Sequence, residues 1–283
     1  MEFTGYLDFW FTDRQLIERV EPYSRLGIKR RHVWCWRLVD MAGLAAECKR
    51  HGSLINSTFD ESMGSLADPA DNELTLRTWA ESLEMAECYG VEHLFIFSNQ
   101  IDIVNGKEWT RRLSRNVPEA VQYANLLNQT EKILKLVEQS KVEVWVEALN
   151  MCPIQGDVLV HNHEVAADWV RRMDHPQFRL AFDCYHQQRT AGNLMDGLVA
   201  YWGLYPTFHI GDVPTRQEPG TGEINFPNLA AKLRELGFDG LIGMEFRPST
   251  TEEEALQKVK AIFQPQLPSP GGRKAEDEGK INL

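Results

Sequence analysis

The sequence predicts a single (β/α)₈ barrel, and three observations carry this prediction. Strand and helix patterns alternate strictly along the chain, which makes the sheet parallel with right-handed crossovers. Eight such units fit within about 250 of the 283 residues, a size typical of this barrel. Polar side chains also follow several strands at their C-terminal ends, where barrel enzymes place the active site. A doubly wound sheet would tolerate the same alternation, but no Gly-x-Gly-x-x-Gly follows the first strand.

The expected strands are short, apolar and often β-branched or aromatic, as strands covered on both faces should be. In chain order they span Thr4–Phe11, Arg31–Trp36, Leu54–Thr58, His93–Phe97, Glu143–Glu147, Arg179–Asp183, Thr207–Gly211 and Gly240–Phe246.

Helical patterns fill the intervals, and several have recognisable ends. Thr12 is a suitable N-cap for the first helix, which Gly27 closes, and Gly237 closes the seventh. The helices are expected over Asp13–Leu26, from a cap at Asp40 to near Gly52, and over Asn72–Tyr89, Pro118–Ser140, Glu164–Met173, Asn193–Leu204, Pro227–Leu236 and Glu252–Phe263. The barrel, a catalytic domain, is thus expected over residues 1–263. The proline- and glycine-rich stretch 264–283 is expected to be a flexible or partner-docked C-terminal tail.

Composition narrows the function classes. The net charge of −11 argues against nucleic acid as a partner, because binding phosphates needs a basic face. Five cysteines without a Cys-x-x-Cys pair indicate reduced thiols and a cytoplasmic protein. The first residues lack the pattern of a secretory signal, and no run of about 18 apolar residues predicts a membrane span.

Four consecutive strands each carry an ionisable side chain at or near the C-terminal end: Glu147, Asp183, His209 and Glu245. Each residue alone would more often be a surface or ion-pair residue, so the argument rests on the joint pattern. In a barrel these ends meet at one mouth, where three carboxylates would repel one another unless a cation lay between them. Three carboxylates and one imidazole suit Mn²⁺ or Mg²⁺ better than structural zinc.

Two further residues are expected to contact substrate. His186 follows Asp183 by three residues and can lean over the same mouth, although a helix-capping histidine is the alternative. Arg216 stands in a long polar loop after the seventh strand, and such loops commonly carry function. Its guanidinium could bind a substrate carboxylate or hydroxyl, against the alternative of an arginine in solvent. In the same loop, Glu223 is expected to order the loop or cap the next helix. His32 is expected either to shape the far wall of the pocket or to pack in the core.

The segments that carry these residues resemble a known family. His209–Arg216, Glu218–Phe226 and Gly240–Glu245, together with Phe182–His186 and Glu147–Asn150, are similar to the hydroxypyruvate isomerases. These belong to the xylose-isomerase-like barrel superfamily, which also contains the ketose 3-epimerases. The resemblance is good from about Glu143 to Pro248. Hydroxypyruvate isomerases commonly carry glutamine at the position of His209, where the epimerases carry histidine, and proline at the position of Ala148.

The resemblance implies that Glu147, Asp183, His209 and Glu245 bind the divalent metal. It also implies that Glu147 and Glu245 form the acid/base pair, while His186 and Arg216 contact substrate. The expected function is isomerisation or epimerisation of a small hydroxy-carbonyl compound or sugar through an enediolate. The alternative is a lyase on the same metal site, a keto-sugar or keto-inositol dehydratase or an enzyme that cleaves an oxidised glycoside. A second subunit or a homo-oligomer is possible in either case. An endonuclease of the same superfamily and a non-catalytic binding barrel are the remaining hypotheses.

Overall fold

The computed structural model describes residues 1–104, 107–150 and 158–264. Eight parallel strands close into a barrel in the hydrogen-bonded order β1-β10-β9-β8-β7-β4-β3-β2. Their bounds are β1 Glu2–Tyr6, β2 Arg30–Val33, β3 Leu54–Thr58, β4 His93–Ile96, β7 Glu143–Glu147, β8 Phe178–Asp183, β9 Thr207–Ile210 and β10 Leu241–Met244. The predicted barrel is confirmed.

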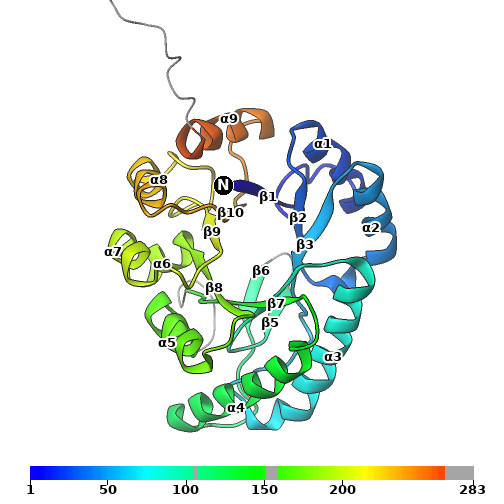
Figure 1. Cartoon of the computed structure of the whole chain (residues 1–283), viewed down its shortest axis with the longest axis vertical. Coiled ribbons are helices and arrows are strands. Elements are labelled where there is room, and N and C mark those ends of the chain that lie inside the picture. Colours follow the sequence, from blue (N-terminus) through cyan, green and yellow to red (C-terminus); the bar gives the residue numbers. More distant parts are fainter. Residues whose placement is uncertain (105–106, 151–157, 265–283) are drawn as a thin grey trace, which may run out of the picture.

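Helices surround the strands, as Figure 1 shows. Their bounds are α1 Val20–Arg25, α2 Met41–Arg50, α3 Asn72–Tyr89, α4 Glu119–Val137, α5 His163–Met173, α6 Cys184–Thr190, α7 Leu194–Ala200, α8 Phe226–Glu235 and α9 Glu252–Phe263. Side-chain caps define several starts: Asp40 accepts from the Gly43 N–H, and Thr251 accepts from the Glu254 N–H. Among the described residues, no helix is both long and apolar enough to cross a membrane.

The first βα unit differs from the expectation. β1 ends at Tyr6, and the aromatic residues that follow lie in a loop, in which Phe11 adopts a left-handed φ of 55°. Their hydrophobicity reflects burial rather than a strand, because Trp10 is fully buried and its indole N–H donates to the Phe246 carbonyl oxygen. The segment predicted to begin the first helix contains instead a 3₁₀ turn over Leu16–Arg19, so that α1 begins only at Val20.

A hairpin and a short helix were not predicted. A two-stranded antiparallel hairpin, β5 (Ile101–Val104) and β6 (Lys107–Thr110), follows β4. The short helix α6 begins directly after β8, because the Asp183 carboxylate accepts a hydrogen bond from the His186 N–H and caps it. Both elements lie on the C-terminal side of their strands and therefore help to shape the mouth of the barrel.

Apolar side chains fill the barrel and the layer between strands and helices. The largest group lies between strands and helices and includes Trp169, Phe178, Phe208 and Phe263. A second group, on the strands β3, β4 and β7 and the segments after them, contains Phe59, Phe95, Phe97, Trp145 and Leu149. The expected tail lies outside the described residues except for Gln264, whose side-chain amide donates to the Met1 carbonyl oxygen over 2.9 Å.

Candidate metal centre

The four predicted ligands come from four neighbouring strands and meet at the C-terminal mouth. Glu147 ends β7 and Asp183 ends β8, His209 lies in β9, and Glu245 directly follows β10. None of the four is more than 6% exposed. The Nδ1 atom of His209 lies 3.0 Å from Glu245 Oε2, 3.8 Å from Asp183 Oδ2 and 3.9 Å from Glu147 Oε1. The structure therefore brings together the residues that the sequence pattern grouped, while their role as ligands stays a prediction.

The strand register explains how these side chains find room. Asp183 of β8 and Gly243 of β10 are the register partners of His209 on either side of β9. A Cβ atom on Gly243 would lie 2.6 Å from the His209 ring, so glycine at this position leaves space for the imidazole. On the other side of that ring, the Tyr6 hydroxyl lies 3.2 Å from each of its two nitrogens.

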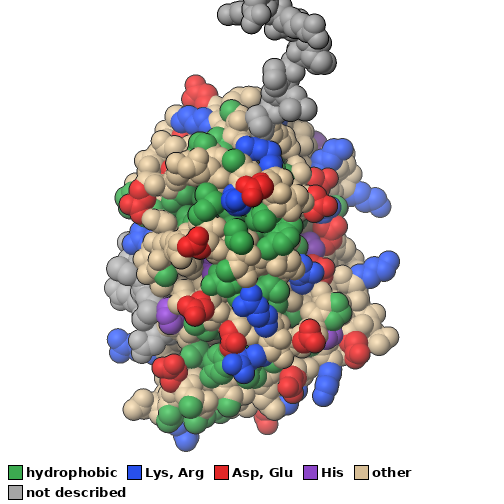
Figure 2. All heavy atoms as spheres, turned by 60° about the vertical axis from the view of Figure 1, so that its left-hand side comes forward, with side chains coloured by type: hydrophobic (Ala, Val, Ile, Leu, Met, Phe, Trp, Pro, Cys, Tyr) green, Lys and Arg blue, Asp and Glu red, His purple; other side chains and the backbone are tan. Residues whose placement is uncertain are grey.

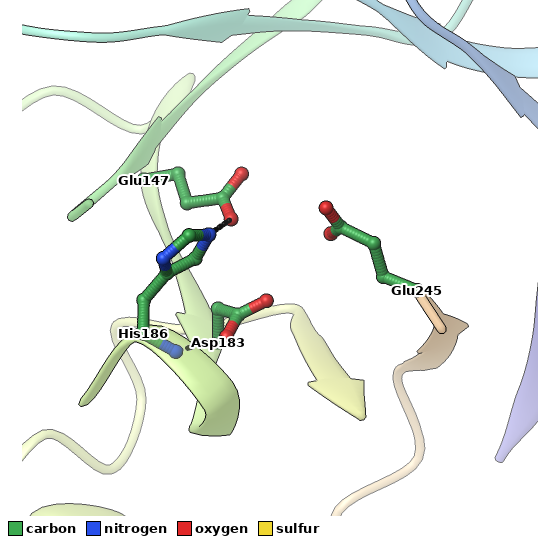
Figure 3. A group of neighbouring side chains, drawn as sticks. All are labelled: Glu147, Asp183, His186 and Glu245. Carbon is green, nitrogen blue, oxygen red and sulfur yellow. Dashed lines mark hydrogen bonds and ion pairs between the residues drawn. The ribbon is translucent and has the colours of Figure 1, made fainter. Parts of the chain in front are cut away.

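His186 joins the same group from the first turn of α6. Its Nε2 atom lies 3.6 Å from Glu147 Oε1, and its Nδ1 atom lies 2.5 Å from the Asn150 side-chain oxygen. Figure 3 shows Glu147, Asp183, His186 and Glu245 converging on one space. One ligand atom from each of these four lies within 4.8 Å of the others. Two imidazoles, His186 and His209, thus border the carboxylates, and His186 is no solvent-facing helix cap.

Arg216 is also part of the site rather than a solvent-exposed arginine. It is only 9% exposed and adopts a left-handed φ of 54°. Its guanidinium forms an ion pair with Glu245, lies 3.3 Å from His186 Nε2, and packs over the rings of Tyr185 and Phe9 at 4.9 and 5.5 Å. This position allows it to bind a substrate oxygen beside the carboxylates.

The loop that presents Arg216 is organised around Asp212, a residue that the sequence reasoning missed. The buried Asp212 carboxylate accepts backbone N–H hydrogen bonds from Val213, Gly220, Gly222 and Ile224, over 2.8 to 3.0 Å. Its carbonyl oxygen accepts from the Arg216 N–H. An aspartate in a loop rich in glycine and proline is a turn-forming signal and could have pointed to this role.

Glu223 was expected to order the loop or to cap the next helix, and its contacts agree with the first alternative. Its side chain accepts a hydrogen bond from Gln188 of α6, and its N–H donates to the Val213 carbonyl oxygen within the loop. The cap of α8 is Asn225, whose side chain accepts from the Asn228 N–H.

Burial and neighbouring charges perturb the ionisation of the group. Burial, followed by the charge of Glu245, raises the pKa of Asp183 to about 6. Burial also acts to raise the pKa of Glu245, but Arg216 and His209 outweigh it and hold that pKa below its ordinary value. Burial, assisted by the positive charge of Arg216, lowers the pKa of His186. The group is therefore rich in negative charge, with one fixed cation, Arg216, beside it.

The donor set fits a divalent cation. The buried Asp183 Oδ2 atom accepts no hydrogen bond from the part of the chain that the structure describes. A buried carboxylate oxygen without a partner is costly, and a bound cation would satisfy it. Carboxylate oxygens with an added imidazole are ligands that Mg²⁺ and Mn²⁺ accept.

A narrow cavity opens beside the group, with an empty volume of about 350 Å³. The charged side of the cavity is formed by Glu147, His186, Arg216 and Glu245. The rest of the wall is mostly aromatic and aliphatic, and it is formed by Tyr6, His32, Trp34, Phe59, Phe95, Phe97, Ile101 and Leu149. Ile101 comes from the unpredicted hairpin. His32 was expected either to shape the far wall or to pack in the core, and it lines this wall together with Trp34.

Comparison with known proteins gives the family. The chain is 24% identical over 273 residues to the Drosophila melanogaster protein named "Putative hydroxypyruvate isomerase", covering 93% of this chain and 98% of that one. Its fold is similar to AP endonuclease, family 2 from Brucella melitensis (TM-score 0.79, 21% identity, 91% of this chain and 97% of that one). It is also similar to D-psicose 3-epimerase from Clostridium cellulolyticum H10 (TM-score 0.76, 14% identity, 93% and 99%). The model of the family described as xylose isomerase-like TIM barrel matches residues 9–264, and the chain belongs to this family.

Proposed function

We propose that the chain is a divalent-metal-dependent isomerase or epimerase of a small hydroxy-carbonyl compound or sugar. The observation that carries this proposal is the buried group of three carboxylates, in which Glu147 and Glu245 face one another across a shared space (Figure 3). The isomerase name of the Drosophila relative supports the same reaction class.

Glu147, Asp183, His209 and Glu245 would hold the metal, with Mn²⁺ or Mg²⁺ as the preferred ion. When bound, a divalent cation supplies positive charge that acidifies a C–H bond next to a carbonyl group. His186 reaches the same carboxylates and, with Arg216, would hold the substrate oxygens.

The two glutamates would move the proton. One carboxylate removes it from the carbon next to the carbonyl, which leaves a planar enediolate of the substrate. The other glutamate, on the opposite side and in its carboxylic-acid form, returns a proton. Return to the neighbouring carbon, with transfer of the hydroxyl proton from one enediolate oxygen to the other, gives isomerisation. Return to the opposite face of the same carbon gives epimerisation. Arg216 adds a fixed positive charge beside the enediolate oxygens, and the aromatic wall excludes water from them.

Deuterium exchange tests the proposal. The full chain, incubated in D₂O with Mn²⁺ or Mg²⁺ and a panel of ketoses, oxo-sugars and hydroxypyruvate, should place deuterium on the carbon next to the carbonyl of one substrate. Glu147→Gln and Glu245→Gln should each slow exchange by about 10²- to 10⁴-fold, as expected for a lost acid or base. Glu143→Gln is the matched control, because Glu143 lies at the opposite end of the same strand.

Three outcomes would contradict the proposal. Absence of exchange across the whole panel, or undiminished exchange in both glutamine variants, would rule out the proposed isomerase or epimerase activity. Exchange accompanied by release of water or an aglycone would reassign the site to the lyase alternative.

Endonuclease activity is not proposed, although one structure with a similar fold carries that name. At 21% identity the likeness shows the fold alone. A net charge of −11 opposes binding to a phosphate backbone. On the face that Figure 2 shows, positive and negative side chains are intermixed rather than gathered into a basic surface.

A further inference from the structure

One imidazole, that of His32, lines the otherwise apolar side of the cavity. This side is contributed by β1 to β4, the segments after them and the hairpin: Tyr6, His32, Trp34, Phe59, Phe95, Phe97 and Ile101. The Tyr6 hydroxyl is already engaged with the His209 ring. His32 is thus a cavity-lining side chain on this wall whose polar function no step of the proposed reaction has yet used.

The His32 ring is held in place by two aromatic rings and at one nitrogen. It stacks on Tyr6 with the ring centroids 4.3 Å apart and meets Phe95 edge-on at 5.2 Å. Its Nδ1 atom lies 2.8 Å from the Ser57 hydroxyl oxygen. A register shift between Arg31 and His32 brings Ser57 of β3 opposite His32. The ring is only 2% exposed, so its orientation is set by these contacts.

The direction of the Ser57 hydrogen bond fixes the tautomer of His32. Ser57 is 2% exposed, and within the described ranges its hydroxyl meets no polar partner except His32 Nδ1. A buried hydroxyl hydrogen needs an acceptor, so the Ser57 O–H donates and Nδ1 accepts. Burial lowers the pKa of His32 to about 3, so the ring is neutral near pH 7. The single ring proton then resides on Nε2.

We propose that His32, held as its Nε2–H tautomer by Ser57, donates a hydrogen bond to an oxygen of the substrate in this cavity. Ser57 acts as a positioning residue. The inference rests on the proposed function and adds a contact point on the aromatic wall of the cavity. A donor fixed on this mainly aromatic wall selects substrates that bear a carbonyl or hydroxyl oxygen there, because an analogue without it leaves the donor unpaired.

The tautomer is tested without any substrate. In the full chain labelled with ¹⁵N-histidine, two-bond ¹H–¹⁵N spectra distinguish protonated from unprotonated ring nitrogens, and His32→Gln identifies the His32 signals by their loss. We expect a protonated Nε2 and an unprotonated Nδ1, with Ser57→Ala shifting the Nδ1 signal. A protonated Nδ1 in the wild-type chain would overturn the proposal.

The substrate contact is tested on the deuterium exchange reaction. His32→Leu removes the donor and should reduce kcat/KM by about 10-fold, the usual effect of losing one hydrogen bond to an uncharged substrate oxygen. His32→Gln keeps an N–H donor and should retain part of this activity, and Ser57→Ala should lose less than His32→Leu. His93→Gln, a change of a half-buried histidine at the opposite end of the barrel, is the control.

Calorimetric Mn²⁺ binding separates the two proposals. All His32 and Ser57 variants should bind Mn²⁺ as the wild-type chain does, which shows that the site has folded. If the wild-type chain catalyses deuterium exchange and His32→Leu does so at the same rate, the His32 proposal is wrong and the proposed function stands. If the wild-type chain catalyses deuterium exchange with no substrate of the panel, both the proposed function and the substrate contact of His32 are wrong.

Discussion

At the residue scale, a single buried carboxylate ties the loop after β9 to the segment after β10. Glu218 accepts hydrogen bonds from the Ser249 N–H, the Ser249 hydroxyl and the Lys258 ammonium group, all over 2.8 Å. Burial acts to raise the pKa of Glu218, but these donors outweigh it and lower the pKa to about 2. Glu218 therefore stabilises the folded chain in its charged form.

We expect Glu218→Gln to destabilise the protein at pH 7 by about 1.5–3 kcal/mol, the usual range for a hydrogen bond to a charged group. Because the folded-state pKa lies below the ordinary value of 4.5, this stabilisation is fully present above pH 4.5 and is lost as the pH falls toward 2. Urea unfolding of the wild-type and Glu218→Gln chains should show a smaller difference in the free energy of unfolding at pH 3 than at pH 7. An equal difference at the two pH values would contradict the stabilising role of the charged Glu218. Glu235→Gln, on the exposed face of α8, should change stability by less than about 0.5 kcal/mol.

Sequence reasoning at this scale identified the residues whose position follows from a strand end, and missed those whose position follows from a tertiary contact. Glu147, Asp183 and Glu245 could be grouped because the end of a strand fixes where they lie. The role of Asp212 depends on how the loop folds back on it. The bond between His32 and Ser57 depends on an irregular register between two strands. Neither arrangement is visible in a residue pattern.

At the element scale, the loop after β9 depends on close backbone contacts. A Cβ atom on Gly222 would lie 1.9 Å from the Val213 carbonyl oxygen and 2.7 Å from Asp212 Oδ1. The backbone must move to accommodate any side chain there, and the hydrogen bonds to Asp212 would be lost with that movement. Arg216 lies in the same loop, so its position in the site depends on this glycine.

Gly222→Ala should reduce deuterium exchange by about 10²-fold, because small displacements of a positioning group cost this much. The barrel itself should remain folded, since the loop lies outside its strands. Circular dichroism and the exchange assay together check this expectation. Gly197→Ala in α7 is the control, since its added methyl group would meet Phe182 at an ordinary 3.4 Å and alanine favours a helix. A Gly222→Ala variant that catalyses deuterium exchange at the wild-type rate would contradict this expectation, because the loop would then tolerate the added methyl group.

The elements that the sequence predicted well are those with a repeated hydrophobic pattern and clear ends. Asn72–Tyr89 and Glu252–Phe263 match α3 and α9 residue for residue. The first strand was extended too far because its aromatic residues are buried in a loop as fully as they would be in a strand. The hairpin β5–β6 was missed although Asn105–Gly106 is a typical two-residue hairpin signal, because the strict alternation of the barrel left no place for it.

At the scale of the whole molecule, closure of the barrel gives it two ends, one at the C-terminal ends of the strands and one at their N-terminal ends. The four proposed ligands meet because β7, β8, β9 and β10 are neighbours in the closed sheet, and the alternation of elements was sufficient to predict this. At the N-terminal end, where a barrel carries stability rather than chemistry, His93 at the start of β4 stacks on Trp145 with ring centroids 3.7 Å apart. Burial, followed by the nearby charge of Arg30, lowers the pKa of His93 to about 3.

This lowered pKa makes the N-terminal end of the barrel sensitive to acid. The unfolded chain binds a proton at His93 below its ordinary pKa of 6.5, whereas the folded chain does so only near pH 3. The stabilisation is fully present above pH 6.5 and is lost progressively as the pH falls toward 3, by at most about 1.4 kcal/mol per pH unit. His93→Phe keeps an aromatic ring against Trp145 without the titration. Its free energy of unfolding, measured in urea from pH 7 to pH 4, should therefore fall less steeply than that of the wild-type chain. An equal slope in His93→Phe and the wild-type chain would show that the acid sensitivity originates at other residues.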